Sequence, residues 1–308
     1  MSLTDAPRGH PPGVAAAPVP DAAWLDRMYN NRARVPDHPA HLAHWAEASA
    51  AARQSLPCQT DVPYGESAGE KLDIFSASPG ATPPAAGAPV LFFIHGGYWR
   101  SLDKADHSFI APPLTAAGAC VVVVNYDLCP AVTIPDITMQ MFKALAWTWR
   151  HIARYGGDPA RVTVAGHSAG GHLAAMLLAA HWKDYATDLP ERAVKNVLSI
   201  SGLYDLAPLE HTPSLKDALR LTPSQVRIAS PALLPAPSHG VLYSVCGGDE
   251  SAEFLRQNRL IQDVWGQRTV PVCESLPGLN HFTIMSALAD PVQRVHRLAL
   301  ELMDLKPA

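Results

Sequence analysis

The sequence predicts an α/β fold with a mostly parallel central sheet and helices on both faces. From residue 90 onward, short apolar runs alternate with longer segments of helical pattern, which is the order of repeated βαβ units. The run at 120–125 (CVVVVN) is apolar as far as its last residue, as in a strand that is covered on both faces. The 308 residues, 48% of them hydrophobic, suffice for one domain with a full core.

The individual elements follow from the same patterns. We expect strands at 72–75, 90–94, 120–125, 161–165, 194–201, 241–246 and 270–274. We expect helices at 108–117, 136–155, 251–265 and 282–305, and one that starts just after Ser168. Asp136 is expected to cap its helix, and the Gly pair at 156–157 to end it.

Two segments are predicted to be helical additions to a single domain at 22–308. Residues 1–21 are rich in Pro, Ala and Gly, so we expect a disordered tail. Residues 22–55 contain two helical patterns, broken near Pro36, whose apolar stripes are predicted to dock as a small cap over the sheet. A Pro-rich helical insertion is expected at 203–237.

The motif GHSAG at 166–170 is the first sign of chemistry. An apolar strand precedes it and an apolar helix follows, which is the strand–turn–helix frame that holds a nucleophilic serine in the α/β-hydrolase fold. Glycines flank Ser168 because the turn is strained and the helix packs close to the strand. The start of that helix also places a partial positive charge beside the serine. Ser168 is therefore the candidate nucleophile.

A serine nucleophile needs a base, and the base needs an acid that orients it. In this fold the acid and the histidine follow the serine in that order, each just after a later strand. Asp249 follows the strand at 241–246, and His281 follows the strand at 270–274. The sequence therefore predicts Ser168, Asp249 and His281 as a catalytic triad.

Two other carboxylates compete for the role of the acid. Asp205 also follows a strand, but a helix cap or a hydrogen bond within the insertion is the favoured interpretation. Glu250 adjoins Asp249, but Asp249 leaves the strand first, so we expect Glu250 to start the next helix instead.

The loop HGGYW at 95–99 is the candidate oxyanion loop, because it follows the strand at 90–94. We expect the backbone N–H groups of Gly97, Tyr98 and Ala169 to bind the oxyanion. Gly96 and Gly97 would let the backbone approach the substrate, so Gly96 is a candidate substrate contact. His95 is expected to hold the loop rather than act as a second base.

Composition limits the kinds of partner. A net charge of −4 without a basic block argues against nucleic acid and favours a small-molecule substrate. No apolar stretch is long enough to cross a bilayer, and the N-terminus lacks the pattern of a signal peptide. The five cysteines do not suggest a disulfide framework. We therefore expect a soluble, cytoplasmic protein without membrane contact, and leave open whether it forms a homodimer.

Metal ligation is not expected. His38, His41 and His44 recur every three residues, but they drift around a helix and have no carboxylate at a metal-binding spacing. No HExxH or CxxC motif occurs. This histidine cluster is interpreted as solvated helix surface.

The motifs together resemble those of the kynurenine formamidase (arylformamidase) family, which is related to the hormone-sensitive-lipase-like esterases. The resemblance runs from about Tyr29 to Pro291 and includes HGGYWRS at 95–101, GHSAG, GGDES at 247–251 and NHF at 280–282. It implies hydrolysis of N-formyl-kynurenine to kynurenine and formate, in tryptophan catabolism, without a cofactor. It also implies that Ser168 is the nucleophile, Asp249 the orienting acid and His281 the base.

The substrate-binding side chains are expected in the same loop. Tyr98 stands where the broader esterase group has a third glycine, so its ring should lie near the site. Tyr98 and Trp99, with a cap residue such as Tyr29, are expected to stack on the aryl ring of the substrate. For Trp99 simple packing beneath the cap is an equally good interpretation.

Two other functions stay open. One is a carboxylesterase for short acyl or aryl esters, which would use the same triad. The other is a catalytically silent hydrolase fold that serves as a binding module, against which the complete triad and the oxyanion glycines argue.

Overall fold

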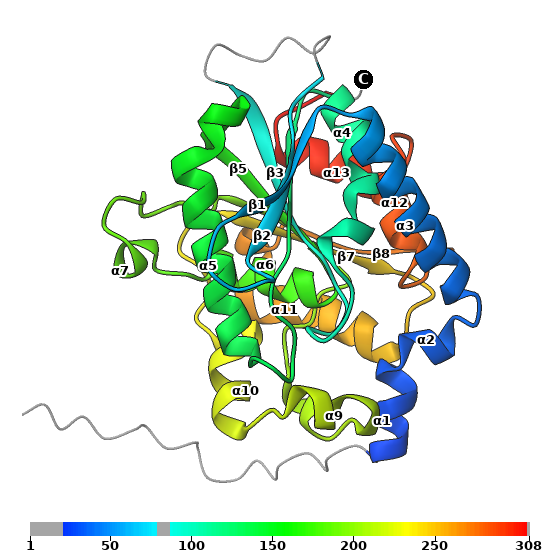
Figure 1. The fold of residues 1–308 in the computed structure, drawn as a ribbon. Helices are drawn as coiled ribbons and strands as arrows, with labels where there is room; N and C mark the ends of the chain where they lie inside the picture. The colour runs from blue at the N-terminus through cyan, green and yellow to red at the C-terminus, as the bar shows by residue number, and fades with distance from the viewer. Residues whose placement is uncertain (1–20, 79–86, 307–308) are drawn as a thin grey trace, which may run out of the picture.

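A single mixed sheet lies at the centre of the molecule (Figure 1). A computed structural model of the chain describes residues 21–78 and 87–306. Within them eight strands pair in the order β1-β2-β4-β3-β5-β6-β7-β8. β2 pairs antiparallel with β1 and with β4, and all the other pairs are parallel. The predicted fold class is confirmed; the predicted tail, 1–21, lies outside the described residues but for Asp21.

The seven predicted strands are all present, and one strand was not foreseen. β1 has the sequence CQTDVP, which is mostly exposed and lacks an apolar alternation, as expected of a polar edge strand. The strand bounds are β1 Cys58–Pro63, β2 Lys71–Phe75, β3 Ala88–Ile94, β4 Cys120–Val124, β5 Gly157–His167, β6 Asn196–Ile200, β7 Val241–Gly247 and β8 Val272–Leu276.

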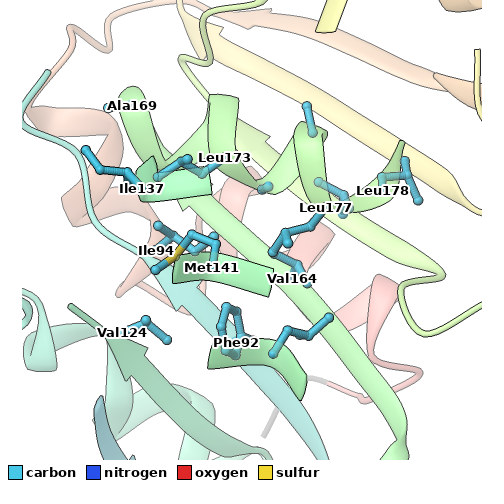
Figure 2. Packing of buried hydrophobic residues seen from close by; sticks show 14 of the residues in the cluster. Phe92, Ile94, Val124, Ile137, Met141, Val164, Ala169, Leu173, Leu177 and Leu178 are labelled. Atoms are coloured by element: carbon cyan, nitrogen blue, oxygen red, sulfur yellow. The ribbon is translucent and has the colours of Figure 1, made fainter. Parts of the chain in front are cut away.

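The core has two halves, one on each face of the sheet. Because side chains alternate along a strand, Phe92 of β3 joins one buried cluster and Phe93 the other. Figure 2 shows the first half, where Phe92 and Ile94 lie with side chains of two covering helices, among them Met141 and Leu173. Both faces of the central strands are therefore dry, which explains the continuous apolar runs in the sequence.

Helices cover both faces. One face carries α5 Ile134–His151, α6 Ala169–Leu178 and α11 Ala252–Thr269, and the other α3 His38–Ser55, α4 Ala111–Ala116, α12 Thr283–Leu288 and α13 Arg294–Leu302. The remaining helices are α1 Ala22–Tyr29, α2 Asn31–Arg34, α7 Trp182–Tyr185, α8 Ala207–Glu210, α9 Pro213–Leu219 and α10 Pro223–Ala229. Short 3-10 turns are η1 Lys104–Asp106, η2 Ser108–Ile110, η3 Ile152–Tyr155 and η4 Pro231–Leu233.

Several predicted helix limits were wrong for local reasons. α5 begins at Ile134, because Thr133 is its cap and Asp136 closes a capping box from inside the helix. The segment 282–305 is divided into α12 and α13, with Pro291 in the break between them. The predicted helix 108–117 is a 3-10 turn followed by α4.

The N-terminal helices extend across the end of the sheet at which the parallel strands have their carboxyl ends. α1 lies against α9 and α11, and its Leu25 and Tyr29 belong to the first core cluster. α3 lies on the opposite face, where Trp45 belongs to the second cluster. The short α2 joins them (Figure 1). The predicted apolar stripes are thus buried in part: Leu25, Tyr29 and Trp45 are buried, Trp24, Met28 and Leu42 are half-buried, and Ala46 is exposed.

Two further findings concern the chain as a whole. All five cysteines are free thiols, as expected for a chain without a disulfide framework. In the described ranges, 21–78 and 87–306, no helix combines the length and the hydropathy that a membrane span requires.

We predict that Thr133→Ala destabilises the fold by about 1 kcal/mol, because it removes the side-chain cap of α5. Thr133 Oγ1 accepts the Asp136 N–H at 3.3 Å, and Asp136 in turn accepts the Thr133 N–H at 2.9 Å. Urea unfolding followed by circular dichroism measures the loss. Thr187→Ala, at an exposed loop position, is the control, and an equal effect of both substitutions would contradict the assignment.

Candidate active site

Ser168 stands at the sharp turn between β5 and α6, as predicted. Its backbone has φ 56° and ψ −115°, a conformation that residues other than glycine rarely adopt. The Ser168 N–H donates to the Ile200 carbonyl at 2.8 Å, which ties the turn to β6. The neighbouring strand thus stabilises the strained residue.

The turn is possible because glycine lets two backbones touch. A Cβ atom at Gly170 would lie 2.0 Å from the Ile94 carbonyl oxygen, so α6 can approach the end of β3 only with glycine there. The interpretation of GHSAG as a close-packed strand–turn–helix is therefore confirmed in its geometry.

His281 lies in the loop after β8, and its Nδ1 is 2.6 Å from Glu250 Oε2. A carboxylate accepts, so the imidazole donates from Nδ1 and keeps Nε2 free of that proton. The other oxygen, Glu250 Oε1, accepts from the Ser201 hydroxyl at 2.5 Å and from the Gly247 N–H at 2.7 Å. Glu250 and His281 are both buried, 7% and 6% exposed.

The expectation that Asp249 is the partner of His281 was wrong. Asp249 is exposed, and its carboxylate has no hydrogen-bond partner among the described residues. After β7 the Gly248 and Asp249 N–H groups donate to the carbonyls of Leu276 and Leu279, so the chain continues beside β8 for two residues. Glu250 is the residue that turns inward. It does not start α11, whose cap is Ser251.

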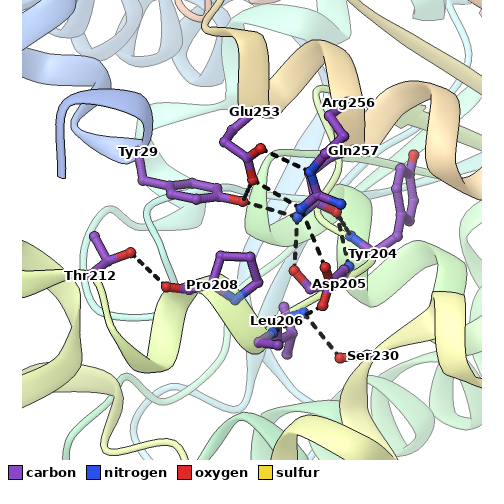
Figure 3. Close-up of polar contacts among 11 residues, drawn as sticks. Tyr29, Tyr204, Asp205, Leu206, Pro208, Thr212, Ser230, Glu253, Arg256 and Gln257 are labelled. Carbon is purple, nitrogen blue, oxygen red and sulfur yellow. Dashed lines mark hydrogen bonds and ion pairs between the residues drawn. The ribbon is translucent and has the colours of Figure 1, made fainter. Parts of the chain in front are cut away.

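The other candidate, Asp205, belongs to a structural network (Figure 3). Asp205 accepts from the Ala207 N–H at 3.1 Å and from Arg256 at 3.3 Å. Arg256 also pairs with Glu253, whose carboxylate accepts the Tyr29 hydroxyl at 2.6 Å. Asp205 thus has the hydrogen-bonding role that we favoured, and the network anchors the end of α1 on α11.

Ser168 and His281 line one cavity of about 350 Å³ at the end of the sheet where the parallel strands finish. Among the described residues there is no hydrogen bond between the Ser168 hydroxyl and the imidazole of His281. Such bonds are often long or misaligned without substrate and shorten in the complex.

Aromatic rings form much of the cavity wall. Tyr29, Trp45, Tyr98 and Phe282 line it, and the Trp45 and Phe282 ring centroids are 6.0 Å apart. The Tyr98 hydroxyl donates to the Tyr29 carbonyl at 2.6 Å. The loop after β3 is thereby bonded to the N-terminal segment.

Two predicted substrate contacts do not line this cavity. Trp99 is fully buried and packs edge-on to His172, with ring centroids 5.0 Å apart, so the packing interpretation holds. Gly96 lies beneath the serine turn: a Cβ there would be 2.9 Å from the His167 carbonyl oxygen. Gly96 therefore permits close packing of the loop rather than contact with a ligand.

The candidate oxyanion donors have no acceptors within the described residues. The Gly97 and Tyr98 N–H groups donate to no backbone or side-chain atom there. Ala169 is the first residue of α6, where an N–H has no acceptor in its own helix. Each of the three is therefore free to bind a ligand atom.

His95 supports the loop, as expected. It is fully buried, its Nδ1 donates to the Gly96 carbonyl at 2.8 Å, and its ring stacks on Tyr126 with centroids 4.2 Å apart. Burial lowers its pKa.

His167 is a buried neighbour of the base that the sequence did not single out. Its Nε2 donates to the His281 carbonyl at 3.0 Å, and the two rings are 4.6 Å apart. Burial, assisted by the nearby His281, holds the pKa of His167 well below its usual range. His167 therefore stays neutral beside His281 and fixes the backbone of that loop.

The histidines of α3 are only partly solvated. The rings of His38 and His41 lie 5.8 and 6.1 Å from the ring of Phe282, and both side chains are half-buried. Only His44 fits the predicted exposed surface.

Known proteins share this fold and align with most of this chain. Residues 91–256 match a family described as having the alpha/beta hydrolase fold. The kynurenine formamidase of Salmo salar is 30% identical over 275 residues, which cover 86% of this chain and 88% of that protein. The chain belongs to the α/β-hydrolase family. Within that family it is similar to kynurenine formamidases, which confirms the resemblance seen in the motifs.

Esterases are also similar over part or most of the chain. Esterase LipC of Mycobacterium tuberculosis is 32% identical over 143 residues, 46% of this chain and 35% of that protein. A crystal structure from Silicibacter sp. TM1040, of a protein proposed to be a thioesterase, has a TM-score of 0.75 and 30% identity, and covers 89% of this chain and 98% of that one.

We predict that Glu250→Gln lowers kcat for p-nitrophenyl acetate by roughly 10⁴-fold, because an amide donates to Nδ1 and forces the wrong imidazole tautomer. Asp249→Asn, one residue away and exposed, is the matched control and keeps near-normal activity. The reverse pattern in the two variants would return the acid role to Asp249.

Proposed function

We propose that the protein hydrolyses an aryl formamide, most specifically N-formyl-kynurenine to kynurenine and formate. The main support is that Ser168, at a strained turn, and His281, which is hydrogen-bonded to Glu250, line the same cavity. Similarity to kynurenine formamidases over 86% of the chain supports the choice of substrate.

In this proposal three side chains share the catalytic work. Ser168 Oγ is the nucleophile, His281 Nε2 is the base, and Glu250 holds the imidazole in the tautomer that leaves Nε2 free to accept. Rotation of the Ser168 hydroxyl toward His281 upon binding would complete the hydrogen bond that is absent without substrate.

Attack on the formyl carbon gives a tetrahedral intermediate. The serine proton moves to His281 as the Oγ–C bond forms, and the carbonyl oxygen becomes an oxyanion. The N–H groups of Gly97, Tyr98 and Ala169 would bind this oxygen, and each such donor lowers the activation barrier by roughly 2.7–4 kcal/mol.

Collapse of the intermediate needs the same histidine as an acid. His281 donates its proton to the aniline nitrogen, which leaves as a neutral amine when the C–N bond breaks. A water molecule, deprotonated by His281, then attacks the formyl-enzyme and releases formate and the free serine.

The aromatic walls support an aryl substrate. Tyr98 and Tyr29 come from segments that are bonded to each other, so their rings are held in place before the substrate binds. A flat ring between such walls gains from stacking and from burial of apolar area. Here Tyr98 is the proposed substrate contact of the loop after β3.

We further propose that the enzyme works in the cytoplasm as a soluble protein, in tryptophan catabolism. Five free cysteines, three of them buried, support a reducing compartment. The net charge of −4 supports a small-molecule substrate rather than nucleic acid.

A carboxylesterase for short acyl or aryl esters is the second candidate. The esterases similar to part of the chain support it, because the same serine, base and oxyanion donors cleave esters. A binding module without catalysis is the third, and a fluorophosphonate probe that fails to label Ser168 in folded protein would favour it.

We predict that the wild type hydrolyses N-formyl-L-kynurenine rapidly and that Ser168→Ala abolishes the reaction, since the nucleophile is gone. The measurement is the rise of kynurenine absorbance. Ser238→Ala, at an exposed serine away from the cavity, is the control and retains full activity.

The same assay separates the two enzymatic candidates. If kcat/KM for p-nitrophenyl acetate exceeds that for N-formyl-L-kynurenine by orders of magnitude, the protein is an esterase. If the substrate is cleaved equally well by the Ser168→Ala variant, the catalytic assignment itself is wrong.

A further inference from the structure

The cavity that holds Ser168 has an unbalanced charge lining. Two of its lining residues are charged, Arg32 and Arg100, and neither an aspartate nor a glutamate lines it. The other lining side chains are apolar, aromatic or uncharged polar groups, or histidine. The chain as a whole has a net charge of −4, so the cavity is locally opposite in sign to the protein.

Arg100 is held at the mouth of the cavity by its surroundings. Its backbone N–H donates to the Gly97 carbonyl at 3.1 Å, and this bond closes the turn that carries the candidate oxyanion donors. Its Nη1 donates to the Ser214 carbonyl at 2.7 Å, on α9. A guanidinium has five N–H donors, so this bond orients the group and leaves others for a ligand.

Arg32 lines the same cavity from the short helix α2. Its side chain is exposed and has no hydrogen bond or ion pair within the described residues. Its neighbour Asn31 is only 6% exposed and also lines the cavity, and the Asn31 Nδ2 is a buried donor without a partner there. Buried donors are nearly always paired in folded proteins, so an unpaired one beside a cavity is available to an acceptor atom of a ligand.

We propose that Arg100, Arg32 and Asn31 form a carboxylate subsite that binds the anionic, amino-acid end of the substrate. This inference rests on the proposed function and names the residues that select the substrate. The formamide at one end of N-formyl-kynurenine lies at Ser168, the aryl ring lies between the aromatic walls, and the α-carboxylate reaches the mouth. Guanidinium groups bind carboxylates with two parallel hydrogen bonds, which fixes orientation as well as position.

The subsite also explains how one fold distinguishes amino-acid formamides from neutral esters. A neutral ester gains nothing from two guanidinium groups, whereas an anion gains charge-assisted hydrogen bonds in a partly enclosed space. The arginines touch the end of the substrate that does not react, so their binding energy serves chiefly for capture and orientation.

The test compares an anionic and a neutral substrate with the same reacting group. N-formyl-L-kynurenine carries the amino-acid end, and 2-formamidoacetophenone lacks it. In Arg32→Gln, Arg100→Gln and the double variant, we expect the ratio of kcat/KM for the first over the second to fall by roughly 10- to 100-fold, the range for hydrogen bonds to a charged group. The fall is expected mainly in KM for the anionic substrate.

Arg34→Gln is the matched control, because Arg34 is an exposed arginine of the same short helix that does not line this cavity. It retains the wild-type ratio. An unchanged ratio in the double variant, or an equal fall in Arg34→Gln, would overturn the subsite. Thermal unfolding of each variant separates loss of folding from loss of recognition.

Equilibrium binding distinguishes failure of the subsite from failure of the proposed function. L-kynurenine binding, measured by calorimetry, is expected to weaken in the double variant, whereas wild type and Arg34→Gln bind it alike. If the wild type cleaves neither formamide but binds L-kynurenine through the arginines, the subsite stands and the proposed reaction is wrong. If both formamides are cleaved and kynurenine binding does not depend on the arginines, the reaction stands and the subsite is wrong.

Discussion

The site depends on the hydrogen bonds of the Glu250 carboxylate, because they join the ends of three neighbouring strands. One oxygen accepts from Ser201, after β6, and from the Gly247 N–H, at the end of β7, while the other accepts from His281, after β8. Burial of the carboxylate without these donors would carry a large desolvation penalty, so all three donors must be in place together. The position of the imidazole is thereby set by the register of the sheet rather than by a flexible loop.

The negative charge near the base is buried, whereas the positive charges of the cavity lie at the surface. The carboxylate that is bonded to His281 is buried, the adjacent His167 is kept neutral by burial, and the two arginines line the cavity with exposed side chains. An anion that enters therefore meets positive charge first and aromatic walls next, and then reaches Ser168 beside His281 and the neutral His167. This order favours capture at the surface without placing a fixed positive charge against the reacting bond.

The sequence predicted those features that depend on local pattern and failed where tertiary contacts decide. Apolar runs located seven strands, and the GHSAG motif located the serine turn, because both are encoded by consecutive residues. The choice between Asp249 and Glu250 depended on two hydrogen bonds, one to the last residue of β8 and one to the loop after it, more than 25 residues away, and nothing in the local sequence records them. Trp99 was ambiguous for a similar reason: its partner His172 lies on α6, far along the chain. The edge strand β1 lacked the apolar signal altogether.

The anchoring of Tyr29 on Glu253 connects residues 224 positions apart. Since the chain is synthesised from its N-terminus, α1 leaves the ribosome long before α11 exists, and the two can dock only when most of the polypeptide is available. A nascent chain that already contains the serine turn still lacks the helix that anchors the N-terminal wall, and it lacks Glu250 and His281 as well. In the proposed mechanism such an incomplete chain has a nucleophile but no base, so we expect hydrolysis only when translation is nearly finished.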